Sequence, residues 1–255
     1  MSRIFGIVPA RMASSRFPGK PLAPIRGRPM VEHVFERARR FDRWDGLFLA
    51  TCDHDIAAFG DAKDWPTIMT GDHHVRALDR VAEAVGLCGH DVTDDDVVVC
   101  VQADEPLLSP DEIEAVTRPF DRDPTVDGTV LAMHIVDEAQ FLNPDIVKLV
   151  HDMKGDVLYT SRSPIPHCKA FSPELGALRI GGIFGFRWRL LRAFSELPES
   201  PLEIAEACDS NRLLDNGFRQ RVAPVPYRPY FSVDSPADRD LVEAAMADDP
   251  LWGGY

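Results

Sequence analysis

Three short runs of apolar residues, none interrupted by a polar side chain, constrain the fold more than any other feature of this chain. They are Ile4–Val8, Leu47–Ala50 and Val97–Val101. Such short runs are typical of strands that are buried on both faces of a parallel sheet. Between them lie Met30–Arg40 and Arg76–Cys88, whose apolar residues recur at helical spacing. Strands that alternate with helices predict an α/β fold with a mostly parallel central sheet.

The second half of the chain has the same elements in a less regular order. Further strands are expected at Thr129–Met133, Val147–Val150 and Arg179–Phe186. Further helices are expected at Arg187–Ser195, Pro201–Asp215 and Pro236–Ala247. Ser235 is placed to cap the last helix, and the glycines of Arg179–Phe186 indicate a close approach of backbones. Because no repeat or linker is present, we expect a single domain over residues 1–255, with an inserted arm at roughly residues 150–190.

The chain is acidic, which narrows the classes of partner. It has 41 Asp and Glu residues against 28 Lys and Arg residues, and its formal net charge is -13. A nucleic-acid surface usually carries an excess of basic residues, so we expect no nucleic-acid partner. No apolar run approaches the roughly 20 residues that cross a bilayer, and the five cysteines form no CxxC pair. We therefore expect a cytoplasmic protein with reduced thiols that acts on small molecules and has no membrane partner.

One segment of this acidic chain, Val8–Lys20 (VPARMASSRFPGK), contains three cations and no carboxylate. Its cations are Arg11, Arg16 and Lys20, and small residues such as Gly19 let a backbone approach a ligand closely. The segment follows the first expected strand, where open α/β sheets bind ligands, and its charge suits a polyphosphate. It is not a P-loop, because the GxxxxGKS/T pattern is absent. A solvated basic loop that pairs with nearby acids explains the composition equally well.

Two aspartates follow expected strands and are candidate ligands for Mg²⁺. Asp104 comes soon after Val97–Val101, and Asp234 lies between a short apolar segment and a helix. Magnesium prefers one or two carboxylates together with phosphate oxygens and water, although each aspartate could instead shape a turn or a cap. The adjacent His73 and His74 lack the i, i+4 spacing of a helical metal pair. GxSxG and GxGxxG patterns are absent, which argues against a hydrolase and a dehydrogenase.

Six segments of the chain, in order and nearly from end to end, resemble motifs of one known family. Val8–Leu22 is similar to its nucleotide-binding signature, I/V-P-A-R-x-x-S-S/T-R-L/F-P-G-K-P-L, and Val101–Pro106 (VQADEP) is similar to its VQGDEP motif. The other four segments are Phe141–Lys148, Leu158–Pro166, Gly182–Arg187 and Ser232–Asp238. The chain thereby resembles the CMP-Kdo synthetase (3-deoxy-manno-octulosonate cytidylyltransferase) family.

This resemblance implies a Rossmann-like nucleotidyltransferase fold, dependence on Mg²⁺, CTP as donor, and a homodimer built partly by the arm. The implied reaction joins CMP to a hydroxyl of an acidic acceptor and releases pyrophosphate. The residues implied as catalytic are Arg11, Lys20, Asp104 and Asp234, of which the two aspartates would hold Mg²⁺. The residues implied to bind the nucleotide are Pro9, Ala10, Arg11, Arg16, Lys20 and Gln102.

The chain departs from the family motifs in three places. Thr70–Arg80 (TGDHHVRALDR) stands where the family has TRxDHxSGTER, Ile180 stands for a histidine, and Asp209-Ser210 stands for Glu-Gln. The residues expected to bind the acceptor are Arg16, Arg76, Gln102, Ile180, Glu206 and Asp209. The loss of hydrogen-bonding groups and the gain of Arg76 favour a smaller or more anionic acceptor, such as the phosphonate phosphonoformate.

Three alternatives remain open beside the phosphonate interpretation. The departures could be drift within enzymes that act on Kdo or a related sugar acid. The chain could be a CTP-binding relative without catalysis. It could also be a nucleotidyltransferase that uses another base.

Overall fold

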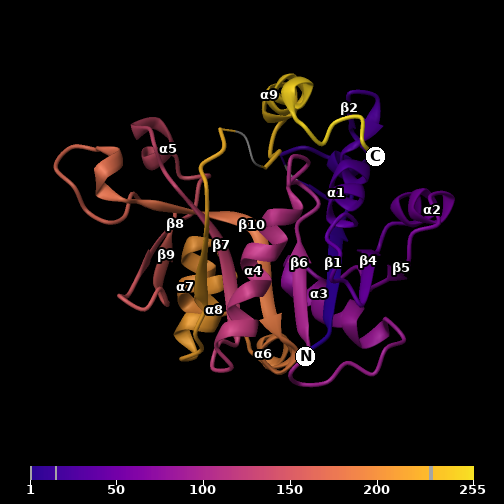
Figure 1. Ribbon diagram of the computed structural model, residues 1–255, viewed down its shortest axis with the longest axis horizontal. Coiled ribbons are helices and arrows are strands. Elements are labelled where there is room, and N and C mark those ends of the chain that lie inside the picture. Colours follow the sequence, from indigo (N-terminus) through magenta and orange to yellow (C-terminus); the bar gives the residue numbers. More distant parts are fainter. Residues whose placement is uncertain (1, 15, 230–231) are drawn as a thin grey trace.

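A nine-stranded sheet runs through the residues that the computed structural model describes, which are 2–14, 16–229 and 232–255. Its order is β11-β7-β10-β6-β1-β4-β5, with β8 and β9 attached beside β10 (Figure 1). The parallel part consists of β1 (Ile4–Ala10), β4 (Gly46–Thr51), β5 (Thr67–Met69) and β6 (Val97–Val101). All residues of β1 and β6 are buried, which confirms the prediction of parallel strands covered on both faces.

Antiparallel strands beside the parallel part make the sheet mixed. Strand β10 (Leu178–Arg187) lies antiparallel between β6 and β7 (Gly128–His134), and β7 pairs in parallel with β11 (Arg221–Val225). Strands β8 (Lys148–His151) and β9 (Val157–Ser161) form an antiparallel hairpin against the start of β10. This hairpin lies within the segment that was expected to form an arm.

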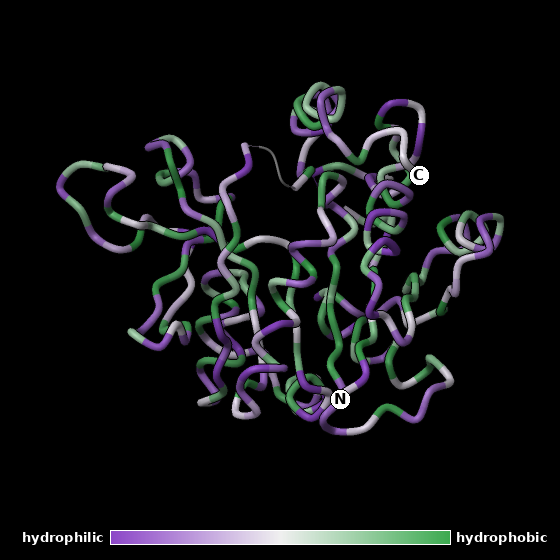
Figure 2. Tube along the Cα trace, in the orientation of Figure 1, coloured by the Kyte–Doolittle hydropathy of each residue, from purple (hydrophilic) through white to green (hydrophobic). Residues whose placement is uncertain are grey.

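Helices cover both faces of the sheet, and each face has its own apolar core. One core includes side chains of α1 (Met30–Ala38), α2 (His54–Ala62) and α4 (Pro110–Arg122). The other includes side chains of α3 (Ala77–Leu87), α6 (Trp188–Glu196) and α8 (Ser210–Asp215). Figure 2 shows the hydrophobic residues gathered along the central strands, with hydrophilic residues along the outer loops. This pattern is that of an open sheet buried between two helical layers.

The remaining elements are short or lie at the rim. They are α5 (Glu138–Leu142), α7 (Pro201–Glu206), α9 (Pro236–Ala245), the strand pair β2 (Pro24–Ile25) and β3 (Arg28–Pro29), and 3-10 turns at Lys20–Leu22, Pro173–Leu175 and Met246–Asp248. Ser235 caps α9 as predicted, and Asp238 completes the capping box. Among the described helices, none is long and apolar enough to cross a membrane.

The prediction of a single helix over Pro201–Asp215 is wrong, because the chain forms α7 and α8 with a break between them. Ala207 adopts a left-handed conformation with φ of 48°. The Arg162 guanidinium donates to the carbonyl oxygens of Glu206 (2.8 Å) and Ala207 (3.3 Å). These carbonyls therefore accept hydrogen bonds from an arginine that is distant in the sequence, and not from the amides of a continuous helix.

Other boundaries also differ from the sequence predictions. The first strand continues through Pro9 to Ala10, beyond the end of its pairing with β6 at Ile7. A strand with one partner tolerates proline, because one side of its backbone makes no ladder bonds. The last helix ends at Ala245 and continues as a 3-10 turn. The sequence analysis did not predict α2, α4, α5, β9 or β11.

Candidate functional site

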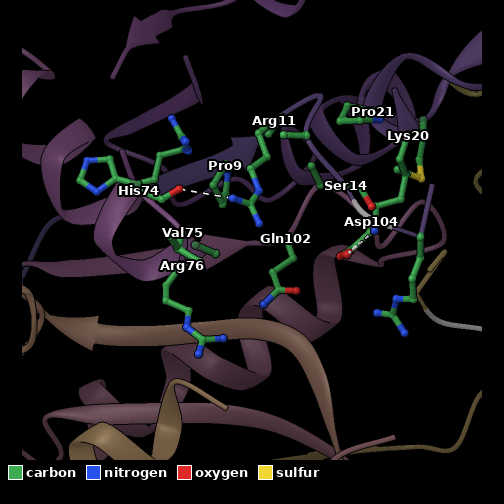
Figure 3. A pocket seen from close by; sticks show the side chains of 17 residues that line it. Pro9, Arg11, Ser14, Lys20, Pro21, His74, Val75, Arg76, Gln102 and Asp104 are labelled. Carbon is green, nitrogen blue, oxygen red and sulfur yellow. Dashed lines mark hydrogen bonds and ion pairs between the residues drawn. The ribbon is translucent and has the colours of Figure 1, made fainter. Parts of the chain in front are cut away.

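A cavity of about 280 Å³ opens at the carboxyl ends of β1 and β6, where parallel sheets usually bind ligands. Both the cationic segment after β1 and the aspartate after β6 line it. Figure 3 shows Lys20 and Asp104 at one end of this cavity, His74 at the other, and Arg11 and Gln102 between them. We call it the nucleotide cavity. The structure thus brings Arg11, Lys20, Gln102 and Asp104 together, as the sequence predicted.

Two of the three cations of the segment pair with carboxylates across the site. Lys20 Nζ lies 2.9 Å from Asp104 Oδ2 and 3.7 Å from Asp234 Oδ1. Arg16 binds Asp234 at 2.9 Å and Asp145 at 2.8 Å. The segment is therefore paired with acids, as expected of a solvated basic loop, but these acids include both candidate metal ligands. The cations and the candidate ligands form one cluster.

Arg11 makes a different contact. Its Nη1 lies 3.4 Å from the carbonyl oxygen of His74, and its side chain lies along the nucleotide cavity (Figure 3). Pro9 and Ala10, also predicted to contact the nucleotide, line the same cavity at the end of β1. All six residues predicted to bind the nucleotide therefore line this one cavity, including Arg16 at its cationic end.

The donor set of Asp104 and Asp234 fits a magnesium ion that shares its ligands with phosphate. Asp104 Oδ1 is buried and has no hydrogen-bond partner within the described chain. Burial raises the pKa of Asp234, and the nearby Asp104 charge adds to this effect. A cation relieves both features, because it satisfies the oxygen and separates the like charges. Among the described residues, no three His, Cys, Asp or Glu side chains form a metal cluster, so water and phosphate would complete the coordination.

A second cavity, of about 240 Å³, adjoins the first and shares Arg16, Gln102 and Asp104 with it. We call it the acceptor cavity. It is lined by Ile180 and Asp209, two of the residues predicted to bind the acceptor. Gln102 borders both cavities, as expected for a residue near the point where donor and acceptor meet.

The sequence analysis missed four charged residues that line the acceptor cavity: Glu105, Asp145, Arg162 and Arg179. Arg179 is 9% exposed and stands near the start of β10, whose residues from Ile180 to Phe186 are apolar or glycine, so this charge could have been noticed in the sequence. Arg162 lies in a segment that resembles a family motif, but no role was assigned to it. Arginines in a cavity of an acidic protein are suited to hold an anionic ligand.

Glu105 is a buried carboxyl group in the acceptor cavity. Burial, helped by the charge of the neighbouring Asp104 and opposed by Arg179, raises its pKa to about 8. Glu105 therefore carries a proton at neutral pH and can donate a hydrogen bond. A Cβ at Gly182 would lie 2.5 Å from Glu105 Cγ and Oε1. Glycine at this position thus allows the close approach of β10 that its sequence predicted.

Arg76 lines the nucleotide cavity, and its guanidinium faces carboxylates instead of open space. Its Nε lies 3.4 Å from Glu199, 3.7 Å from Glu203 and 3.8 Å from Asp209. Burial raises the pKa of Asp209 to about 6, while Arg76 opposes this shift. The charge of Arg76 is therefore already balanced by the protein.

Glu206, the other acid predicted to contact the acceptor, is not among the residues that line either cavity. Its carboxylate accepts hydrogen bonds from Tyr159 Oη (2.7 Å), Ser161 Oγ (2.7 Å) and the Arg162 amide (2.8 Å). Burial favours a higher pKa for Glu206, but these hydrogen bonds prevail and lower it. The structure therefore places Glu206 as a link between β9 and α7, away from the other predicted acceptor ligands.

A comparison with known proteins identifies what this arrangement resembles. The family model described as Cytidylyltransferase matches residues 5–221. A 3-deoxy-manno-octulosonate cytidylyltransferase of Nitratidesulfovibrio vulgaris (strain DP4) is 46% identical over 244 residues, which are 93% of this chain and 94% of that relative. Another, from Anaeromyxobacter sp. (strain Fw109-5), is 40% identical over 250 residues, 98% of this chain and 99% of the relative.

Solved structures agree on the fold. CMP:2-keto-3-deoxy-manno-octonic acid synthetase complexed with CTP matches with a TM-score of 0.87 and 34% identity, over 96% of this chain and 99% of that one. A 4-diphosphocytidyl-2C-methyl-D-erythritol synthase matches with a TM-score of 0.64 over the same shares of the chains, but at 14% identity, so it supports the fold alone. The predicted nucleotidyltransferase fold is thereby confirmed.

Proposed function

Because this chain belongs to the cytidylyltransferase family, we propose that it transfers CMP from CTP to a hydroxyl of a sugar acid such as 3-deoxy-manno-octulosonate, and releases pyrophosphate. The observation that carries this proposal is the cluster of Arg16, Lys20, Asp104 and Asp234, which lies where the nucleotide cavity meets the acceptor cavity. Phosphates, metal ligands and acceptor would all meet at this junction.

The residues of the cluster have distinct roles in the proposed reaction. Arg11, Arg16 and Lys20 bind the phosphates and stabilise the charge on the leaving pyrophosphate. Asp104 and Asp234 would hold Mg²⁺ in place of their ion pairs with Lys20. When bound, Mg²⁺ reduces the repulsion between anionic donor and acceptor and makes a coordinated hydroxyl more acidic. Catalysis then rests on alignment of the acceptor hydroxyl with the α-phosphorus and on charge compensation.

The surroundings of Asp209 favour a hydroxyl-rich sugar acid over a phosphonate. The phosphonate interpretation relied on Arg76 as an additional cation for the acceptor. Arg76 instead faces three carboxylates, and the Arg212 guanidinium beside them is bound by Glu203 and Asp79. Four acids thus balance two arginines, and among these four Asp209 is the acid that lines the acceptor cavity. Its carboxylate would repel a second negative charge on the acceptor and would accept hydrogen bonds from acceptor hydroxyls. The names of the relatives agree with a sugar acid.

Pyrophosphate release tests the proposal. With CTP and Mg²⁺, we expect turnover with 3-deoxy-manno-octulosonate and little or none with phosphonoformate. The same screen distinguishes the alternatives. Turnover of the phosphonate alone would contradict the sugar-acid assignment. Tight binding of CTP in calorimetry without turnover of any acid would instead indicate a non-catalytic relative.

The proposed contact of Asp209 with the acceptor predicts a pH dependence. With a pKa of about 6, Asp209 is a carboxylate at pH 7 and becomes protonated as the pH falls through that value. A protonated Asp209 accepts hydrogen bonds from acceptor hydroxyls less well. We therefore expect kcat/KM for the acceptor to fall between about pH 7 and pH 5, and Asp209→Asn to remove this step.

Steady-state kinetics over that pH range measures the effect. Asp215→Asn is the matched control, because Asp215 ends α8, the helix that follows Asp209, but does not line the acceptor cavity. This control should retain the pH step. Retention of the step in Asp209→Asn would show that another group titrates.

We also propose that the protein acts as a homodimer. Large apolar side chains are exposed on the hairpin of β8 and β9 and on the neighbouring α7, namely Met153, Leu158, Leu202 and Ile204. The bond between Tyr159 and Glu206 joins β9 to α7, so these side chains belong to connected elements. Exposed apolar side chains on connected elements are suited to contact with a second subunit.

A further inference from the structure

The two ends of the nucleotide cavity differ in character. Arg16, Lys20 and Asp104 form the charged end, which suits a triphosphate with its metal ion. Away from this end the lining includes the apolar residues Pro9, Ala10, Val75 and Ala77 and the polar residues His74, Arg76 and Arg80. Apolar side chains suit the faces of a nucleobase, and polar side chains suit its edge. A nucleotide that places its phosphates at the charged end would place its base among these residues.

One of the arginines that line the nucleotide cavity is buried. Arg80, in the first turns of α3, is 2% exposed and belongs to the lining of the nucleotide cavity. Its Nη1 donates to Thr70 Oγ1 and to the carbonyl oxygen of Gly71 (3.2 Å). Its Nη2 is buried and has no hydrogen-bond partner in the part of the chain that the structure describes. A buried N–H group of a cation is costly when unpaired, so its position in a cavity indicates a ligand acceptor atom.

The segment that holds Arg80 is itself fixed. The Gly71 amide donates to Glu83 Oε2 at 2.9 Å, and the same oxygen lies 2.5 Å from His74 Nε2. Arg80 is therefore oriented before a ligand binds, because one of its two acceptors, the Gly71 carbonyl, belongs to a backbone segment that is anchored to Glu83. An oriented donor discriminates between ligands better than a flexible one.

We propose that the Arg80 guanidinium recognises the cytosine ring of CTP by donating hydrogen bonds to O2 and N3 of the ring. Cytosine presents two adjacent acceptors there, whereas N3 of uracil carries a proton and would oppose the guanidinium donor. A site built to donate to a base acceptor rejects the analogue that lacks it, because a buried donor is then left unpaired. Arg80 was not among the residues that the sequence analysis assigned to the nucleotide. This inference rests on the proposed function in its use of CTP as donor.

The test is the ratio of affinities for CTP and UTP, measured by calorimetry with Mg²⁺ and without an acceptor. We expect the native protein to prefer CTP, and Arg80→Lys to weaken CTP binding on the order of 10- to 100-fold while UTP binding changes little. Arg11→Lys is the contrasting variant. Arg11 lies between the two ends of the cavity and is assigned to phosphates, so its loss should weaken CTP and UTP alike.

A second variant keeps the inference testable if Arg80→Lys does not fold. Thr70→Val removes the hydroxyl that holds Nη1 but keeps the arginine and the side-chain shape, and it should lower the CTP preference several-fold. Folded Arg80→Lys and Thr70→Val proteins with the native CTP-to-UTP ratio would overturn the inference. Because the readout is binding, it does not depend on acceptor turnover. Failure of the sugar-acid assignment alone would therefore leave the ratio measurable.

Discussion

Replacement of Asp104 by asparagine is expected to lower kcat by about 100- to 1,000-fold without unfolding the protein. Asp104 is adjacent to Lys20 and Asp234, and its Oδ1 has no partner among the described residues, so it has an oxygen available for a metal. Asparagine preserves the shape but supplies only a neutral oxygen, which binds Mg²⁺ more weakly. Pyrophosphate release at increasing Mg²⁺ concentration measures the effect, and added Mg²⁺ should restore part of the rate.

The matched control is Asp121→Asn. Asp121 also forms an ion pair with an arginine, at 2.8 Å from Arg43, but it is exposed and belongs to α4. Its replacement should leave kcat within about two-fold of the native value, since exposed ion pairs contribute little. Native activity in Asp104→Asn, with the melting temperature unchanged, would contradict the assignment of this aspartate to the metal.

Replacement of Arg212 by methionine is expected to reduce the free energy of unfolding by about 3–5 kcal/mol. Arg212 is 3% exposed and binds Glu203 through Nε (2.7 Å) and Nη2 (2.8 Å), and Asp79 through Nη1 (3.2 Å). It also lies over the Phe194 ring. Burial favours a lower pKa for Arg212, but Glu203 and Asp79 prevail and raise it. Methionine would leave the fully buried Glu203 carboxylate with the Ser200 amide at 3.2 Å and with Arg76, at 3.7 Å, as the cation near it.

Urea unfolding monitored by circular dichroism measures this loss. Arg192→Met is the matched control, because its pair with Asp94 is exposed on both sides and should contribute less than about 1 kcal/mol. An equal loss in the two variants would show that the buried pair does not hold α7 and α8 in place. If it does, Arg212→Met should also raise KM for the acceptor, since Asp209 lies next to α8.

The parallel core of the fold could be predicted from the sequence because local patterns there agree with tertiary placement. Val97–Val101 is a strand with the predicted boundaries, and the predicted helices at Met30–Arg40 and Arg76–Cys88 are present with slightly shorter bounds. Helix α4 was missed, although Ser109 and Glu112 form its capping box. The helical pattern of this segment is less clear in the sequence because Pro119, a residue that usually ends a helix, stands inside α4.

The break between α7 and α8 had no comparable local signal. Ala207 favours helix by intrinsic propensity, yet it ends α7 in a left-handed conformation. The cause is Arg162, which is far away in the sequence and binds the carbonyls at the break. Tertiary hydrogen bonds override local propensity in this way, and a sequence pattern read along the chain does not contain them.

For the donor half of the site, the sequence by itself determined which residues meet. Arg11, Arg16, Lys20 and Asp104 follow β1 and β6, and neighbouring parallel strands bring their carboxyl ends to one edge of the sheet. Placement after a buried strand was therefore sufficient to bring them together. Their types, three cations and a carboxylate, then indicated phosphate and metal.

The acceptor half was decided only by the tertiary structure. Whether Arg76 offers a free charge depends on Glu199, Glu203 and Asp209, which lie more than a hundred positions later in the chain. Likewise, the unpaired Nη2 of Arg80 depends on how the loop at Gly71 packs. Charge is a property of one residue and can be read from the sequence. Its compensation is a property of neighbours in space, which only the packed chain specifies.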